Sequence, residues 1–307
     1  MDWSPWQPVN PRLNLKPAVL AEVLDGGQAF RWFRSPEPST LRSAGEGGHR
    51  RTADGGFWTG QWAEHVAQLR TPGARVEWRA PAAGAAATGH ALHRYLGLDQ
   101  DWTALTDALP WRSDAHLAQC VAAFPGLRLL RQPFGETLLG FLCSATKQIV
   151  QIKQMVALLA QRHGTEVAPG CFRLPRWDEL ARVPESELRR CLLGFRAKFI
   201  HATACYLAAR PGWLEETENL SYAAAKARLL ELPGVGEKVA DCVLLFGAGR
   251  IEAFPVDTWV LKSLARRYGL HGWKPAAVAQ FGRAHFGPRA GLAQQYLFAW
   301  ERKYGDR

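Results

Sequence analysis

The chain has 307 residues, with 38 Lys and Arg against 28 Asp and Glu, and its pI is about 9.6. This length is sufficient to bury a sizeable core in two or three domains or subdomains. The basic excess suits a polyanionic partner such as nucleic acid, although ribosomal and membrane-surface proteins share it. No run of about 18 apolar residues occurs, so the sequence predicts no membrane span.

The six cysteines lie far apart and form no C-x-x-C pair. We therefore expect reduced thiols, not disulfides or a metal centre. The first residues have neither the apolar segment of a signal peptide nor the character of a transit peptide, so we do not expect secretion.

Residues 1–100 are rich in glycine, proline and short strand-like segments separated by turn-rich stretches such as 43–48. This pattern predicts a small, twisted antiparallel sheet with a few helices. The segments expected to form strands are 29–33, 56–62, 66–69 and 76–79.

A low-complexity stretch at residues 80–88, APAAGAAAT, predicts a loose connection, and the pattern from His90 onward is helical. The fold class is therefore α+β, with an N-terminal domain at 1–100 and a mostly helical region at 101–307. The helices expected most clearly are 136–144, 177–183, 185–208 with an interruption at 194–198, 223–231, 237–246, 258–268 and 291–304.

The sequence Leu-Pro-Gly-Val-Gly at 232–236 lies between two of these helices. Pro233 ends the first helix, and we expect Gly234 and Gly236 to adopt backbone conformations closed to other residues. The result is a hairpin that presents backbone N–H groups and the positive end of a helix. Such a site suits a phosphate diester.

Lys238 follows this hairpin in the first turn of a helix, and Asp257 precedes the next helix. Taken alone, Lys238 is typical of a solvated surface residue and Asp257 of a helix N-cap. The positive helix end disfavours a charged ammonium, however, so a lysine at this place can also be a nucleophile.

The hairpin, Lys238 and Asp257 together resemble the helix-hairpin-helix, Gly/Pro/Asp superfamily of DNA base-excision glycosylases. The segments KVADC at 238–242 and PVD at 255–257 are most similar to 8-oxoguanine DNA glycosylases. No cysteine follows Cys242, which does not fit the branches that carry an iron–sulfur cluster. The resemblance implies that Lys238 is the catalytic nucleophile, that Asp257 is the catalytic aspartate, and that Gly234 and Gly236 contact DNA.

Two further motifs resemble the family's base pocket. GGQAFRW at 26–32 implies that the carbonyl of Gly27 accepts a hydrogen bond from N7–H of the damaged base. GLAQQYLF at 291–298 implies that Gln294 reads the Watson–Crick edge and that Phe298 stacks on the base, with Cys242 on the opposite face. Gln294 and Phe298 are four residues apart, so they project from the same side of a helix.

A third group resembles the residues that fill the gap left by a flipped base. The family has S-x-N-N-x-I-x-R-I where this chain has SATKQIVQI at 144–152, so Thr146, Lys147 and Gln148 occupy the loop and Gln151 replaces an arginine. This departure weakens the expectation of strict cytosine discrimination opposite the lesion.

The motif GFRAK at 194–198 implies that Phe195 wedges under a base pair and that Arg196 contacts the orphaned base. Trp259 stands where most relatives have a phosphate-binding histidine, and a tryptophan offers one N–H donor in its place. Lys262 continues a basic face suited to backbone phosphates.

The resemblance implies a monomeric, bifunctional glycosylase and abasic-site lyase that acts on double-stranded DNA without a metal or redox cofactor. We expect it in the cytoplasm at a bacterial nucleoid, or in a nucleus. Two alternatives remain: an alkylpurine glycosylase that uses the aspartate with water, and a DNA-binding protein that has kept the hairpin without catalysis. Covalent trapping by borohydride discriminates, because neither alternative forms a Schiff base.

Overall fold

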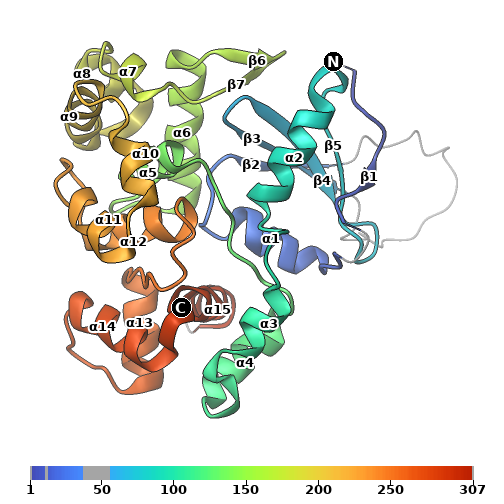
Figure 1. Cartoon of the computed structure of the whole chain (residues 1–307), viewed down its shortest axis with the longest axis vertical. Helices are drawn as coiled ribbons and strands as arrows, with labels where there is room; N and C mark the ends of the chain where they lie inside the picture. The colour runs from blue at the N-terminus through green and yellow to red at the C-terminus, as the bar shows by residue number, and fades with distance from the viewer. Residues whose placement is uncertain (1, 11–12, 37–55, 306–307) are drawn as a thin grey trace, which may run out of the picture.

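The computed structural model describes residues 2–10, 13–36 and 56–305, so the turn-rich stretch predicted at 43–48 lies outside it (Figure 1). An antiparallel sheet has the strand order β1-β5-β4-β3-β2. Its strands are β1 (Gln7–Pro8), β2 (Trp32–Pro36), β3 (Gly56–Trp62), β4 (His65–Arg70) and β5 (Glu77–Arg79). The predicted small antiparallel sheet is therefore confirmed.

Helix α1 (Pro17–Asp25) and helix α2 (Ala85–Tyr95) complete the N-terminal part. The prediction of a loose connection at 80–88 was wrong, because a short 3₁₀ turn (Ala82–Gly84) leads directly into α2. Alanine has the highest helix propensity. In addition, α2 buries one face, including Thr88 and Leu92, and Thr88 Oγ1 lies 3.2 Å from Nδ1 of His65 at the start of β4.

The remainder is mostly helical, which confirms the predicted fold class. Its first helices are α3 (Trp102–Asp107), α4 (Ala115–Ala123), α5 (Phe134–Leu142), α6 (Ile149–His163), α7 (Trp177–Leu180) and α8 (Glu185–Leu188). They are followed by α9 (Arg196–Ala208), α10 (Trp213–Asn219), α11 (Tyr222–Leu229), α12 (Glu237–Phe246), α13 (Thr258–Tyr268), α14 (Pro275–Phe286) and α15 (Ala290–Tyr304). A small hairpin of β6 (Glu166–Ala168) and β7 (Cys171–Phe172) follows α6.

The interruption predicted at 194–198 lies earlier in the structure. Helical geometry is lost at Cys191 and Leu192, and Leu192 and Gly194 have positive φ angles of 62° and 57°. Helix α9 then begins at Arg196, inside the predicted break. The reversal is therefore made by Leu192 together with Gly194, the first residue of the GFRAK motif.

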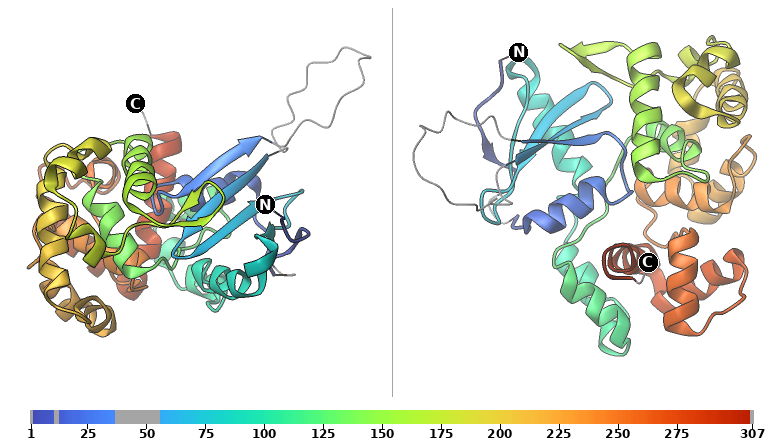
Figure 2. Two further views of the ribbon diagram at one scale, coloured as in Figure 1. Left: turned by 90° about the horizontal axis from the view of Figure 1, so that it is seen from above. Right: turned by 180° about the vertical axis from the view of Figure 1, so that it is seen from behind.

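The last helix joins the helical part of the chain to the N-terminal part. In two views α15 lies between α13 and the N-terminal part (Figures 1 and 2). Arg302 on α15 donates to Glu22 on α1, and Tyr296 OH lies 3.2 Å from Thr106 Oγ1 on α3. One hydrophobic core runs through both parts of the described chain. The domain boundary at residue 100 stays a prediction.

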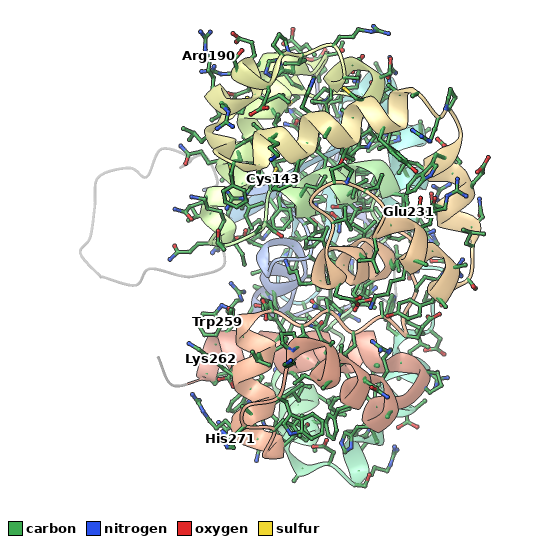
Figure 3. All side chains as sticks on the ribbon, turned by 90° about the vertical axis from the view of Figure 1, so that its left-hand side faces the viewer. Cys143, Arg190, Glu231, Trp259, Lys262 and His271 are labelled. Atoms are coloured by element: carbon green, nitrogen blue, oxygen red, sulfur yellow. The ribbon has the colours of Figure 1, made fainter. Side chains whose placement is uncertain are left out.

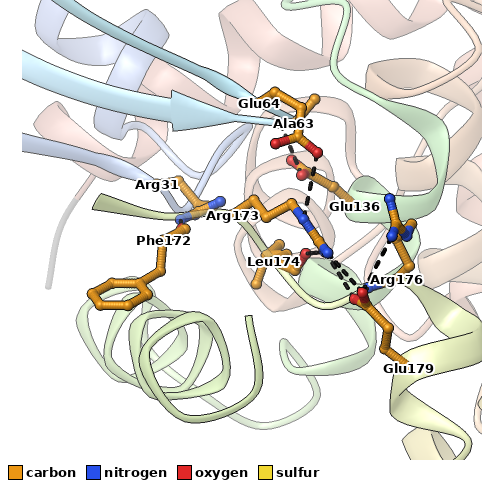
Figure 4. A network of polar contacts seen from close by, with 9 residues as sticks. All are labelled: Arg31, Ala63, Glu64, Glu136, Phe172, Arg173, Leu174, Arg176 and Glu179. Atoms are coloured by element: carbon orange, nitrogen blue, oxygen red, sulfur yellow. Dashed lines mark hydrogen bonds and ion pairs between the residues drawn. The ribbon is translucent and has the colours of Figure 1, made fainter. Parts of the chain in front are cut away.

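A network of charged residues joins the sheet to the helices beyond it (Figure 4). Arg173 makes two hydrogen bonds to Glu179, at 2.8 and 2.6 Å, and these lower the pKa of Glu179 to about 2. Arg173 also pairs with Glu64 at 3.4 Å, and Arg31 donates to the carbonyl of Phe172. The β6–β7 hairpin is thereby fixed between β3, β4 and α7.

Candidate functional site

A groove is lined by residues 144–152, by Lys238 of α12 and by the start of α13, and a smaller pocket adjoins it. Both cavities are lined by Gly27, Phe141, Lys238, Asp257 and Phe298. The pocket walls therefore come from five separate parts of the chain: the loop after α1, α5, α12, the segment before α13, and α15. The pocket and the groove therefore meet at these shared residues, which include the two predicted catalytic ones.

Lys238 lies in the first turn of α12 and is half-buried. Its Nζ donates to Ser144 Oγ at 2.9 Å and lies 5.1 Å from the centre of the Phe141 ring. Ser144 Oγ in turn donates its own proton to the carbonyl of Phe141 at 2.7 Å. Because a hydroxyl has a single proton, Ser144 offers only a lone pair to Lys238, and the amine is held on the pocket side of α5.

Asp257 is the N-cap of α13, as its place in the sequence predicted. Its Oδ1 accepts from the N–H of Val260 at 2.8 Å. Burial raises the pKa of Asp257, while the backbone N–H groups and the charge of Lys238 act in the opposite direction. The same carboxylate therefore caps a helix and faces the pocket.

The predicted base-reading residues lie together. Gln294 and Phe298 line one wall of the pocket from α15, and Cys242 lines it from α12. Burial raises the pKa of the Cys242 thiol to about 12, so this side chain is a neutral surface. Gln294 is buried and already held, because its Nε2 donates to the carbonyl of Pro255 at 3.1 Å and its Oε1 accepts from Gln295 at 2.7 Å.

Gly27 needs to be a glycine for two reasons. Its φ of 104° lies in the region that L side chains avoid, and a Cβ would make a tight contact of 3.2 Å with Ile149 Cδ1. The next residue, Gln28, fixes this loop to the helical part. Its side chain donates to the carbonyl of Arg128 and accepts from the N–H of Leu130, both at 3.0 Å.

The hairpin is supported by α9. Thr203 Oγ1 donates to the carbonyl of Pro233 at 2.9 Å, and a Cβ on Gly234 would meet Phe199 at 2.7 Å. Gly234 has a φ of 81°, which confirms the expected glycine conformation. The same expectation for Gly236 was wrong: its φ is −107°, which any residue adopts, and a Cβ there would face open space. Gly236 leaves room beside the first N–H groups of α12.

The predicted loop residues Thr146, Lys147 and Gln148 are exposed and line the groove. Thr146 has a φ of 54°. Gln148 and Gln151 form a reciprocal cap at the start of α6, in which the N–H of Gln148 donates to Gln151 Oε1 at 3.2 Å. Gln151 therefore stabilises the N-terminus of α6, which is a structural role.

Arg196 is only 3% exposed, although a DNA contact was predicted for it. Its Nε donates to the carbonyl of Ala145 and its Nη2 to Thr146 Oγ1, both at 3.0 Å, and its Nη1 donates to the carbonyl of Leu193 at 3.1 Å. The guanidinium thus joins the Thr146 loop to the turn before α9. The direct contact with an orphaned base stays a prediction, while the geometry shows a positioning role.

Phe195, Trp259 and Lys262 are exposed, as DNA-contact residues must be. Trp259 and Lys262 line the groove. Figure 3 shows both on the edge of the molecule that also carries Arg190, whereas Glu231 lies on the other side. No described helix is long and apolar enough to cross a membrane.

Sequence reasoning missed three contributors to the site. Ser144 and Gln28 lie inside motifs that were recognised, but their hydrogen bonds depend on partners far away in the sequence. Phe141 lies in the helix predicted at 136–144, for which no role in the site was expected, yet it lines the pocket beside Lys238 and stacks on Phe246 with ring centres 5.6 Å apart. The positions of Ser144 and Gln28 inside these motifs were the available signals.

Residues 12–138 match the family model of the 8-oxoguanine DNA glycosylase N-terminal domain. The N-glycosylase/DNA lyase OGG1 of Arabidopsis thaliana is 35% identical over 209 residues, which cover 62% of this chain and 56% of that protein. The chain therefore spans little more than half of that relative's length. Apo 8-oxoguanine glycosylase/lyase of Clostridium acetobutylicum is similar in structure, with a TM-score of 0.77, 30% identity and 92% coverage of both chains. Its complex with double-stranded DNA containing cytosine opposite 8-oxoG gives a TM-score of 0.81 at 27% identity and covers both chains fully.

Proposed function

The chain belongs to the 8-oxoguanine DNA glycosylase family, and we propose that it is a bifunctional enzyme that excises 8-oxoguanine from duplex DNA and then cleaves the strand. The observation that carries this proposal is the pocket that Lys238 and Asp257 share with Cys242, Gln294 and Phe298. An amine and a carboxylate meet there between two surfaces that suit the faces of a flat base.

A base in a duplex is out of reach of an enzyme nucleophile, so the nucleotide must leave the stack, at a cost of a few kcal/mol. The groove binds the backbone through Lys147, Lys262 and the hairpin N–H groups. The flipped base enters the pocket, where Phe298 and Cys242 cover its faces. Gln294 and the carbonyl of Gly27 test its edges.

The neutral amine of Lys238 attacks C1′, and the bond from C1′ to the base breaks with its electron pair going to the base. Asp257 stabilises the positive charge that develops on the sugar and accepts a proton from the attacking nitrogen. Opening of the sugar ring gives a Schiff base. Loss of a C2′ proton and departure of the 3′ phosphate then cleave the strand by β-elimination.

We further propose that the protein is a monomer, that it acts on double-stranded DNA, and that it is located with the DNA of the cell. Cleavage of duplexes with 8-oxoguanine opposite each of the four bases, with and without borohydride, tests it. Excision with a borohydride-dependent adduct supports it. If 8-oxoguanine is not excised, but a duplex that contains methylated purines releases them without an adduct, the alkylpurine alternative is favoured. Binding without any excision favours the non-catalytic alternative.

We expect Ser144→Ala to slow covalent trapping at an abasic site about tenfold while DNA affinity stays unchanged, because one lost hydrogen bond to the nucleophile is worth roughly 1 to 1.5 kcal/mol. Ser144→Thr keeps the hydroxyl and should restore most of the rate. The measurement is single-turnover trapping with saturating enzyme. Equal rates for Ser144→Ala and the wild type would show that the 2.9 Å contact does not orient the amine.

The loop sequence predicts weak discrimination of the base opposite the lesion. We expect Thr146→Asn combined with Gln151→Arg to raise the preference for cytosine over adenine about tenfold, since a good base-edge contact is worth about 1 to 3 kcal/mol. The comparison is excision of 8-oxoguanine opposite each base. Thermal unfolding provides the control, because Gln151 also caps α6. An unchanged ranking of the four bases would contradict the prediction.

A further inference from the structure

Three non-glycine residues in the described chain have positive φ angles: Ala63 at 45°, Thr146 at 54° and Leu192 at 62°. Ala63 lies in the tight turn between β3 and β4. The other two lie in turns on the same side of the structure, joined by Arg196. A left-handed conformation is unfavourable for a bulky residue such as leucine, and strain of this kind gathers at functional sites.

The conformation of Leu192 places its side chain outside the core. Cys191 and Leu193 on either side of it are fully buried, whereas Leu192 is 52% exposed. Leucine gains nothing from this exposure, since burial of its side chain is worth about 1.5 to 3 kcal/mol. Phe195, three residues later, is 53% exposed. The turn therefore presents two large apolar side chains to solvent.

The turn is held rigidly beside the groove. Arg196 donates to the carbonyl of Leu193 and, with the same guanidinium, to the carbonyl of Ala145 and the hydroxyl of Thr146. Residues 145 and 146 line the groove, and the turn also contacts α6, which begins at the end of that loop. Leu192 thus has a fixed place relative to the groove.

We propose that Leu192 is a second wedge residue, which inserts with Phe195 into the duplex beside the flipped nucleotide. Apolar side chains act in this way when they enter a base step, where they replace the stacking that the distorted duplex has lost. Cationic side chains flank the turn in the sequence and suit phosphates beside it: Lys198, and Arg189 and Arg190, which pair with Glu185 and Glu187. The inference rests on the proposed function, because it needs a DNA duplex with an extruded nucleotide.

Two variants separate DNA contact from backbone effects. Leu192→Ala removes most of the side chain and keeps the strain of the positive φ, whereas Leu192→Gly removes both. Leu230→Ala is the matched control, because Leu230 is a leucine that is 38% exposed on the C-cap of α11. The probes are a duplex containing a stable abasic analogue and the same duplex without damage, together with the thermal midpoint of the protein alone.

We expect both Leu192 variants to bind the abasic duplex about tenfold more weakly, which corresponds to the loss of one buried apolar contact, and to bind the undamaged duplex as the wild type does. Leu192→Gly should melt at or above the wild-type temperature, so its weaker binding cannot come from unfolding. Leu230→Ala should change neither affinity. Abasic-duplex affinity within twofold of the wild type for both Leu192 variants overturns the proposal and leaves Leu192 as an exposed surface residue.

The outcomes also separate this proposal from the proposed function. If the wild type binds the abasic duplex but releases no 8-oxoguanine, the proposed function fails and the comparison of Leu192 variants still decides the wedge. If the wild type releases 8-oxoguanine and the Leu192 variants bind the abasic duplex as the wild type does, only the proposal that Leu192 is a wedge residue fails.

Discussion

Replacing Lys238 with glutamine is expected to abolish the borohydride-dependent adduct and to lower excision by about 10⁴-fold or more, since removal of a catalytic nucleophile has effects of this size. The side chain of glutamine is polar and its amide can still donate to Ser144, which accepts from Lys238 at 2.9 Å. The pocket should therefore keep its shape. Single-turnover excision on an 8-oxoguanine duplex measures the loss.

Lys262→Gln is the matched control for this experiment. Lys262 is an exposed lysine of the groove, outside the smaller pocket. Its loss should weaken binding and reduce the salt dependence of affinity by about one phosphate contact, with the covalent adduct retained. If Lys238→Gln behaved in the same way as Lys262→Gln, Lys238 would be a phosphate contact. The result would then favour the alkylpurine glycosylase alternative.

Replacing Asp257 with asparagine is expected to lower excision by about 10² to 10³-fold, because it removes one preorganised charge from the transition state. The thermal midpoint should not fall together with the excision rate. The amide oxygen can still accept from the N–H of Val260, which now donates to Oδ1 at 2.8 Å. Single-turnover rates and thermal midpoints of the same preparations measure both effects, and a large fall in the midpoint would show that the variant tests folding instead of catalysis.

The pH dependence of Asp257 follows from its burial. Because burial raises its pKa in the folded protein, the ionised carboxylate costs stability at neutral pH, and this cost disappears as the pH falls below the unfolded-state pKa. The asparagine variant should therefore melt at or above the wild-type temperature at neutral pH. The wild-type reaction needs the ionised carboxylate. As the pH is lowered, the rate of excision should therefore begin to fall at a higher pH than it would with an aspartate of ordinary pKa. That decline should be absent from the remaining activity of the variant.

Local signals in the sequence predicted well the elements that carry the proposed catalytic residues. Helices α12 and α13 have the bounds expected from apolar periodicity, the hairpin glycines and the Asp257 cap. Gln294 and Phe298 share a pocket wall because residues four apart on a helix must do so. Each of these predictions depends on neighbours within one or two turns.

Contacts with partners far away in the sequence could not be predicted from local patterns. Arg196 sits in a motif that implies DNA contact, but its guanidinium is buried by a loop that is 50 residues away in the sequence. The alanine-rich stretch at 80–88 resembles a linker in the sequence. It leads into helix α2 in the structure, because α2 packs against β4. The contact between Ser144 and Lys238 spans 94 residues, so no local pattern contains it.

The most direct test of the account is to treat the wild-type protein with borohydride during its reaction with a duplex that contains 8-oxoguanine opposite cytosine, and to map the trapped adduct on the protein. We predict a single covalent link, on the peptide that contains Lys238, together with a strand cut 3′ to the lesion. Excision without an adduct, or an adduct on a different lysine, would contradict the central claim that Lys238 is the nucleophile.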